Sequence, residues 1–165
     1  MGENEMSAIA YINQTVIPAA LGMLPAKMDT PAARAMLLAI GLQESRFEHR
    51  RQIGGPARGY YQFERGGGVR GVLNHSATRP IIEQVLTAMT YGTADEISYN
   101  AIEHNDILAT IYARLLLWTH PRPLPVRAVP EQGWFYYTAT WRPGKPHRAT
   151  WDDFYETAWG MTEGS

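Results

Sequence analysis

Cysteine is absent from this sequence, which excludes a disulfide framework, a thiolate nucleophile and a zinc site with cysteine ligands. Long apolar runs are absent too, and no stretch approaches the length that a helix needs to span a bilayer. The first residues, Met1–Glu5, are polar and acidic, unlike the basic and apolar regions of a signal peptide. We therefore expect no membrane partner and no signal peptide.

An excess of charge of either sign is also missing. Lysine and arginine total 15 against 16 aspartate and glutamate residues, which gives a net charge of -1 and an isoelectric point of about 6.5. Proteins that bind nucleic acid through its phosphates carry a clear basic excess. The composition therefore argues against nucleic acid as a partner.

The chain does contain enough apolar sequence for one globular core. Of its 165 residues, 45% are hydrophobic and 11% aromatic, so a single domain over residues 1–165 is expected. Apolar residues recur at helical spacing, and sustained strand alternation is rare, which predicts a mainly α fold. The expected helical segments are 8–24 (kinked at Pro18, or two short helices), 30 to about 47, 79–91, 95–99, 105–119, 133–137 and 150–159.

The segment Met36–Phe47 is predicted to end the central helix, and it carries one carboxylate on its apolar side. At about 100° per residue, Glu44 projects from the same face as Leu37 and Ile40. Burial disfavours a charged carboxylate and raises its pKa, and an acid that stays protonated near neutral pH can act as a general acid. Glu44 is therefore the candidate catalytic residue. A salt-bridged or capping glutamate near a helix end is the alternative interpretation.

Residues 48–71 contain seven glycines and five arginines, and we expect a long, shaped loop with a short strand or hairpin through Tyr60–Phe63. In one interpretation, Tyr60, Tyr61 and Gln62 form a cleft wall. Tyrosine rings pack against sugar faces, and an amide both donates and accepts hydrogen bonds. In the other interpretation, this is a glycine-rich turn whose aromatic side chains lie in the core.

Neither a metal site nor a cofactor is predicted. The five histidines are scattered along the chain, and none forms the His-Glu-x-x-His pair that places two ligands on one helix face. The Gly-x-Ser-x-Gly elbow of serine hydrolases is not present either.

Two short motifs resemble those of the lytic transglycosylases, which belong to the goose-type-lysozyme-like superfamily. Gln43–Phe47 resembles the Glu-Ser motif, in which the glutamate ends a helix and serves as catalytic acid and base. Gly59–Phe63 is similar to the family's Gly-Leu-Met-Gln motif, with two tyrosines in place of Leu-Met. Further along, Asn105–Leu117 looks like the next family helix, and Tyr136 or Tyr137 looks like the tyrosine that follows it.

The resemblance implies a lysozyme-like catalytic domain with a long glycine-rich loop or small hairpin beside the cleft. It also implies cleavage of the β-1,4 bond between N-acetylmuramic acid and N-acetylglucosamine in bacterial peptidoglycan. One glutamate, here Glu44, would protonate the leaving oxygen and then accept a proton from the muramic acid 6-hydroxyl, which yields a 1,6-anhydro product. No cofactor is implied, and the expected partners are peptidoglycan glycan strands.

The resemblance also implies roles for residues near Glu44. Ser45 would orient Glu44 by a hydrogen bond. Gln62, with Tyr60 or Tyr61, would hold the sugar. Tyr137, or its neighbour Tyr136, would be the cleft tyrosine.

Two alternatives stay open from the sequence. A muramidase-type hydrolase would need a second carboxylate about 6.5–9.5 Å from the first to activate water with inversion, and Glu64, Glu103 and Asp106 are the candidates. A bacteriophage virion protein of the same fold could bind the wall without cleaving it. Since no signal peptide is expected, we expect the protein in a phage virion or a host cell, acting on the bacterial wall or periplasm, with other virion proteins as further candidate partners.

Overall fold

The structure is a computed structural model that describes residues 8–163, so the predicted polar start, Met1–Glu5, lies outside the described residues. The described part is mainly helical and contains isolated β-bridges but no strand, which confirms a mainly α fold. No helix within it is both long enough and apolar enough to cross a membrane. The elements are η1 (Ile12–Val16), α2 (Ile17–Leu21), η2 (Ala26–Met28), α3 (Pro31–Ser45), η3 (Arg65–Val69), α4 (Arg70–Asn74), α5 (Arg79–Ala88), α6 (Asp95–Ala101), α7 (Asp106–Trp118), α8 (Pro130–Trp141) and α9 (Arg148–Glu163).

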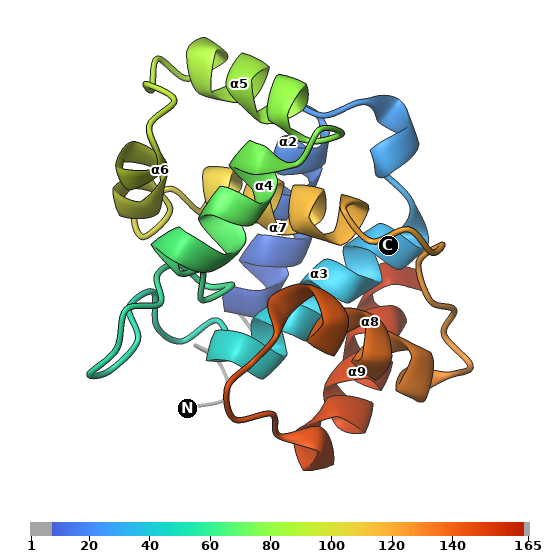
Figure 1. Cartoon of the computed structure of the whole chain (residues 1–165). Helices are drawn as coiled ribbons and strands as arrows, with labels where there is room; N and C mark the ends of the chain where they lie inside the picture. The colour runs from blue at the N-terminus through green and yellow to red at the C-terminus, as the bar shows by residue number, and fades with distance from the viewer. Residues whose placement is uncertain (1–7, 164–165) are drawn as a thin grey trace.

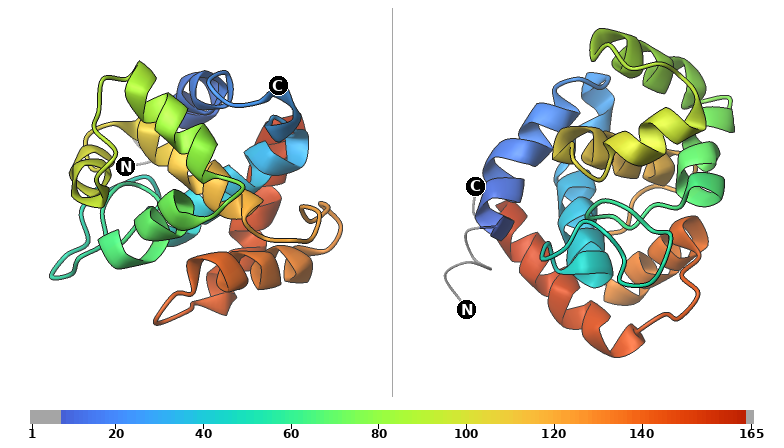
Figure 2. Two further views of the ribbon diagram at one scale, coloured as in Figure 1. Left: turned by 45° about the horizontal axis from the view of Figure 1, so that its top comes forward. Right: turned by 90° about the vertical axis from the view of Figure 1, so that its left-hand side faces the viewer.

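Helix α3 lies in the middle of the molecule, in contact with both α7 and α9 (Figures 1 and 2). Thr30 begins it as predicted: its hydroxyl oxygen accepts a hydrogen bond of 3.1 Å from the backbone N–H of Ala33, and Pro31 takes the first helical position. All residues from Ala35 to Leu42 are buried. The helix is therefore enclosed on every side, and not on the single face that the sequence indicated.

The chain reverses sharply where α3 ends at Ser45, because Arg46 and Phe47 both adopt left-handed backbone conformations, with φ of 56° and 55°. This reversal places the Phe47 ring against Gly41, where a side chain would leave no room for it. The Ser45 hydroxyl fixes the turn: it donates to the Gly41 carbonyl oxygen and accepts from the Phe47 N–H. Glu44 is thereby held in the last turn of α3.

The glycine-rich segment is a loop only over residues 48–64, which contain two isolated β-bridges that share Arg58. No strand forms through Tyr60–Phe63, and of the predicted hairpin only one antiparallel bridge, between Arg58 and Phe63, is present. The second half, which the sequence also indicated as loop, is helical in η3 and α4. Burial of Val69 and Val72 in the core offsets the weak helix propensity of the glycines beside them.

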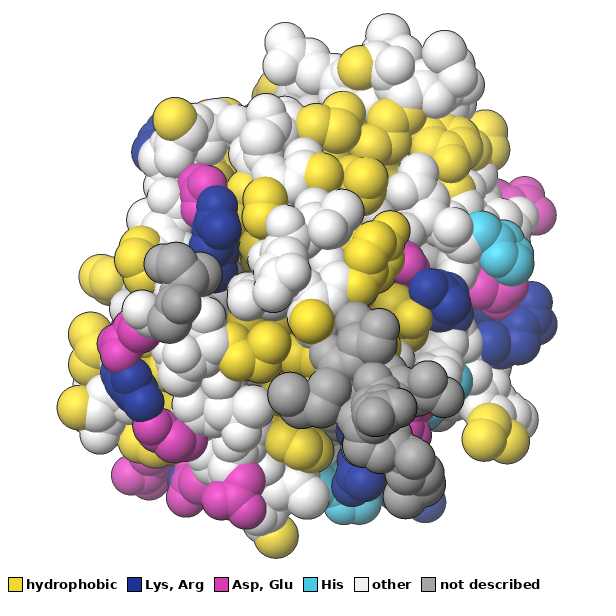
Figure 3. Space-filling view, turned by 180° about the vertical axis from the view of Figure 1, so that it is seen from behind, with side chains coloured by type: hydrophobic (Ala, Val, Ile, Leu, Met, Phe, Trp, Pro, Cys, Tyr) yellow, Lys and Arg dark blue, Asp and Glu magenta, His cyan; other side chains and the backbone are white. Residues whose placement is uncertain are grey.

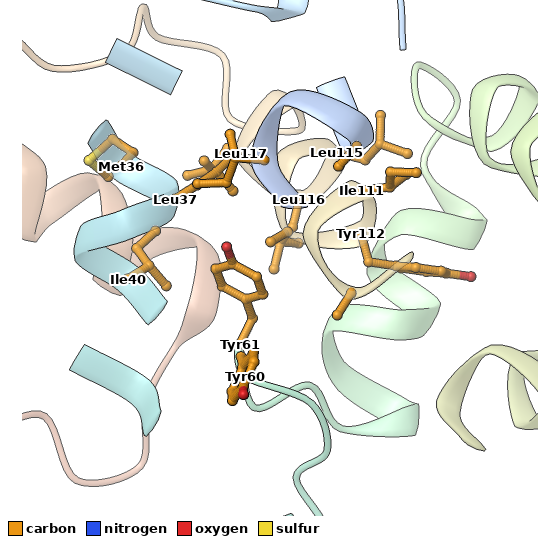
Figure 4. Close-up of a cluster of buried hydrophobic side chains, with 14 of the residues drawn as sticks. Met36, Leu37, Ile40, Tyr60, Tyr61, Ile111, Tyr112, Leu115, Leu116 and Leu117 are labelled. Atoms are coloured by element: carbon orange, nitrogen blue, oxygen red, sulfur yellow. The ribbon is translucent and has the colours of Figure 1, made fainter. Parts of the chain in front are cut away.

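The tyrosines of this loop lie in the core. Tyr61 points into a cluster of aliphatic side chains from α3 and α7, including Leu37 and Leu116 (Figure 4). Tyr60 and Tyr61 both contact the Phe47 ring edge-on, with centroids 5.4 and 6.2 Å apart. Of the two interpretations of this loop, the one that places its aromatic side chains in the core is confirmed for both tyrosines.

Helices α8 and α9 pack together through aromatic side chains. Two of these side chains hold the first residue of α8 and the proline-rich connector before it, residues 121–129. The Trp151 indole N–H donates to the carbonyl oxygen of Pro130 at 2.8 Å. The Tyr155 hydroxyl donates to the carbonyl oxygen of Val126, also at 2.8 Å. The aromatic segment at 133–137, predicted as a short helix, is the middle of the longer α8.

The irregularity predicted at Pro18 is present. Residues 8–21 are helical, and the π-helical stretch η1 comes directly before α2, which contains Pro18 in its first turn. Proline has no N–H to donate and crowds the preceding turn, and a widened turn accommodates it.

Charges are mixed on the surface. Figure 3 shows the face opposite to that of Figure 1, where most of the basic side chains lie beside acidic ones. Ion pairs such as Arg34–Asp29 and Arg127–Glu156 follow the same arrangement. Part of the charged surface is thus neutralised locally by ion pairs.

Gly41→Ala should destabilise the fold, although alanine favours helix more than glycine does. A Cβ atom at Gly41 would lie 2.0 Å from Cζ of Phe47, so the ring and the turn after α3 would have to shift. We expect the free energy of unfolding, measured by urea denaturation, to fall by about 1–3 kcal/mol. Gly160→Ala in α9 is the matched control, because a Cβ there meets nothing within 4 Å. It should leave stability unchanged or raise it by up to about 1 kcal/mol, and equal effects of the two substitutions would contradict the packing described here.

Candidate active site

A cleft with a volume of about 580 Å³ opens beside the last turn of α3. Its other walls are the 48–64 loop and the segment that runs from the end of α8 to the start of α9. The residues that line it include Gln43, Glu44, Gln62, Glu64, Tyr137, Trp141, Arg142, Lys145 and His147.

Glu44 is half-buried in this cleft, and no cation of the described residues pairs with its carboxylate. Loss of water around the carboxylate raises the pKa of Glu44 to about 7, and a hydrogen bond from Tyr137 opposes part of that rise. At neutral pH both the acid and the carboxylate are therefore populated. This state suits a group that donates a proton and takes one back, and it differs from the salt-bridged glutamate of the alternative interpretation.

Tyr137 holds the carboxyl group in place. Its hydroxyl donates to Oε1 of Glu44 at 2.7 Å, and its ring stacks on Trp151 with centroids 5.1 Å apart and planes inclined by 7°. Burial, together with the nearby Glu44, raises the pKa of Tyr137, so its hydroxyl stays protonated and remains a donor. No described side chain bonds to Oε2 of Glu44, which leaves that oxygen for a ligand in the cleft.

Gln62 reaches the same cleft from the loop. Its backbone is left-handed, with φ of 54°, and its side-chain amide donates to the carbonyl oxygen of Gly59 at 2.9 Å. The donated bond fixes the side chain, while the amide oxygen accepts no hydrogen bond from the described residues. Gln62 can therefore offer an acceptor to a hydroxyl or an N-acetyl group.

Three residues predicted to act in the site, by orienting Glu44 or by binding the sugar, do not line the cleft. Ser45 is 2% exposed, and its hydroxyl bonds to the backbone of Gly41 and Phe47 and not to Glu44. Tyr60 and Tyr61 are 8% and 2% exposed, and their rings pack in the core. The physical reason is shared: each side chain stabilises the turn or the core that positions the neighbouring cleft residue.

The sequence left open whether Tyr136 or Tyr137 faces the cleft, and the structure places Tyr137 there. The Tyr136 hydroxyl donates to the carbonyl oxygen of Leu117 at 2.8 Å, on another side of α8. Consecutive helical residues point about 100° apart, so only one of the two can reach Glu44.

Of the three candidates for a second carboxylate, Glu64 lines the cleft, where it is exposed. Glu103 pairs with Arg51 at 2.7 Å, and that hydrogen bond lowers the pKa of Glu103. Asp106 pairs with Arg50 at 2.9 Å. Glu103 and Asp106 therefore hold the 48–64 loop on α7 and its preceding turn, and neither lines the cleft.

The wall formed by residues 141–147 was not predicted as part of the site. Gln43 anchors it: its amide donates to the carbonyl oxygen of His147 at 2.9 Å, and its carbonyl oxygen accepts from the Thr150 hydroxyl at 3.0 Å. Arg142 and Lys145 are exposed on this wall. The sequence signal for this wall was the proline-rich turn at 141–146, which follows an aromatic helix, but none of its residues formed a recognisable catalytic or binding motif.

Comparison with known proteins gives no match to a family model, to a curated protein or to a solved structure. Within residues 8–163, no three histidine, aspartate or glutamate side chains gather in a way that could hold a metal ion. The interpretation of the cleft therefore depends on its geometry and on the motif Gln43–Phe47.

Glu44→Gln should stabilise the protein at alkaline pH and much less in acid. The carboxyl releases its proton near pH 4.5 in the unfolded chain and near pH 7 in the folded one, so wild-type stability falls between these values. Glutamine has no such transition. By urea denaturation we expect the variant to gain up to about 3 kcal/mol over wild type at pH 8 and little at pH 4.5.

Glu64→Gln is the matched control, since Glu64 is an exposed glutamate on the same cleft. Its difference from wild type should stay within about 0.5 kcal/mol at both pH values. A gain for Glu44→Gln that is the same at pH 4.5 and pH 8 would show that Glu44 is not desolvated.

Proposed function

We propose that this protein is a peptidoglycan lytic transglycosylase that cleaves the β-1,4 bond between N-acetylmuramic acid and N-acetylglucosamine. The observation that carries the proposal is Glu44: one half-buried acid with a pKa of about 7, at a helix end, with Oε1 bonded to Tyr137 and Oε2 open to the cleft. The resemblance of Gln43–Phe47 to the Glu-Ser motif supports it. The fold would then be lysozyme-like, and the protein would reach the wall in a phage virion or from inside an infected host.

In the first step, Glu44 in its acid form donates its proton to the glycosidic oxygen. The bond from C1 of muramic acid to that oxygen breaks, and N-acetylglucosamine leaves with a free 4-hydroxyl group. Glu44 is then a carboxylate, and the hydrogen bond from Tyr137 stabilises the new charge. A partly desolvated acid with a pKa near neutrality suits this step.

In the second step, the 6-hydroxyl group of the same muramic acid attacks C1. Its proton passes to the Glu44 carboxylate, which restores the acid and closes the 1,6-anhydro ring. The substrate supplies the nucleophile, so the step needs no second carboxylate. Gln62 and the half-buried ring of Trp141 would bind the sugar, the first by hydrogen bonds and the second by packing.

A muramidase-type hydrolase is the second candidate, and Glu64 favours it. Glu64 is a second glutamate on the same cleft, and no basic side chain of the described residues forms an ion pair with it. A carboxylate in that position could activate a water molecule for attack on C1. The products distinguish the two reactions, because hydrolysis leaves a reducing end.

Digestion of purified peptidoglycan, with the muropeptides analysed by mass spectrometry, tests the proposal. We expect 1,6-anhydro products from wild type and from Glu64→Gln, and none from Glu44→Gln, which keeps the shape of the side chain but cannot donate the proton. The folded state of Glu44→Gln is checked by its urea denaturation curve.

Other outcomes of the digestion are equally informative. Reducing-end products, one water heavier, that disappear in Glu64→Gln would replace the transglycosylase with the hydrolase. Absence of products from wild type on several wall types would overturn cleavage altogether and favour a protein that only binds the wall.

The pH dependence of cleavage should report the protonation of Glu44. The initial rate at low substrate concentration should fall about tenfold per pH unit above pH 7, as the acid form is lost. Tyr137→Phe removes the hydrogen bond that favours the carboxylate, so this alkaline limb should move to higher pH. Tyr136→Phe is the matched control and should keep the wild-type limb, because Tyr136 does not line the cleft. A limb that is identical in all three proteins would show that Glu44 is not the titrating group.

A further inference from the structure

A second pocket, with a volume of about 550 Å³, lies away from the cleft, between η2, the start of α3, the end of α7 and the proline-rich connector. Its polar and cationic lining residues are Lys27, Thr30, Arg114, His120, Arg122 and Tyr136. The lining includes no aspartate or glutamate. This pocket and the cleft share no lining residue.

Arg114 is the unusual residue of this pocket, because it is a cation that is only 2% exposed. Its Nε donates to the carbonyl oxygen of Met28 at 2.8 Å, and its guanidinium lies 5.4 Å from the centroid of the Trp118 ring. Among the described residues, no acceptor bonds to either terminal nitrogen, and no carboxylate forms an ion pair with it. A buried cation without a counter-charge is costly, so an anion in the pocket would be strongly favoured.

Asp29, the acidic group that acts on Arg114, forms no ion pair with it. Asp29 faces Arg34, and its two carboxylate oxygens accept from Arg34 at 2.8 and 2.9 Å. Asp29 acts on Arg114 only through space. The two terminal nitrogens of Arg114 thus remain available to a ligand.

The other donors of the pocket complete the arrangement. Lys27 and Arg122 are exposed cations on its rim. His120 accepts a hydrogen bond at Nδ1 from the Arg122 N–H, so its neutral ring carries the proton on Nε2, where it can donate. Three permanent cations and an imidazole N–H exceed what one carboxylate needs, and a forked guanidinium matches the oxygens of a phosphate group.

We propose that this pocket binds the phosphate group of a small phosphorylated ligand, with Arg114 as the buried anchor and Lys27 and Arg122 closing over the phosphate from the rim. The volume is larger than one phosphate ion needs, and Trp118 and Leu124 add apolar walls for the organic part of a phosphate ester. The site does not depend on the cleavage of peptidoglycan. Tyr136 lines the pocket and Tyr137 lines the cleft, so the two lie on different sides of α8.

Isothermal titration calorimetry at constant ionic strength tests the site, with inorganic phosphate, glycerol 3-phosphate, a dimethyl phosphate diester and acetate as probes. We expect saturable binding of phosphate and tighter binding of glycerol 3-phosphate, with acetate at least about tenfold weaker. Tighter binding of the monoester than of the diester supports a small phosphate monoester, whereas tighter binding of the diester would overturn the assignment to a small ligand. Binding of acetate as tight as phosphate would overturn it.

Variants locate the binding. The double variant Lys27→Ala/Arg122→Ala changes only exposed residues and should weaken phosphate at least about tenfold. Arg114→Lys keeps the charge but loses the fork, and a similar loss is expected. The matched control, Arg142→Ala/Lys145→Ala on the cleft wall, removes the same charge elsewhere and should bind as wild type does.

Three results would overturn the proposal: no saturable binding to wild type, equal weakening in the control, or unchanged binding in the Lys27→Ala/Arg122→Ala variant. Phosphate binding by Arg114→Lys is interpreted only if the urea denaturation curve of this variant without phosphate matches that of wild type. If the curves differ, the test rests on the Lys27→Ala/Arg122→Ala variant. Peptidoglycan cleavage by the Lys27→Ala/Arg122→Ala variant is measured as well. The binding assay then reports on this pocket and the cleavage assay on the cleft, so a failure of one proposal is distinguished from a failure of the other.

Discussion

The hydrogen bond between Tyr137 and Glu44 is the interaction on which the cleft depends, because it joins helices that are far apart in sequence. It forms only if α3 ends at the right residue and α8 presents the right face. The turn at Phe47 secures the first condition, and stacking on Trp151 secures the second. Helix α3 is enclosed by α7 and α9, so the rest of the core supplies the burial that allows a half-desolvated acid at its end.

Features that follow from local sequence were predictable. The helices that begin at Thr30 and Asn105 start where the apolar repeats indicated, and each of these residues caps its helix through a side-chain oxygen. Glu44 was placed on the buried side of its helix by spacing alone, and the structure gives it the raised pKa expected from burial. For the two caps the determining contacts lie within a few residues of each other, so the sequence contains them directly.

Features that depend on distant contacts were not predictable. A cleft wall and a core turn have the same local pattern of tyrosine and glycine, and packing on α3 and α7 decides that Tyr60 and Tyr61 are in the core. Gly59, with φ of 76°, lies so close to the backbone of Ile102 that a Cβ there would be 2.9 Å from its carbonyl oxygen. No residue near Gly59 in the sequence indicates this close contact with Ile102. The wall at 141–147 was missed for the same reason, since Gln43 anchors it from about a hundred residues away.

The Gln43 side chain links the wall at 141–147 to the last turn of α3. Gln43 holds the wall at His147 and Thr150, and it is bonded covalently to Glu44. The two hydrogen bonds of Gln43 therefore fix the position of this wall relative to the end of α3. The wall and Glu44 both line the cleft, so one polar side chain next to the acid also sets where the opposite side of the cleft lies.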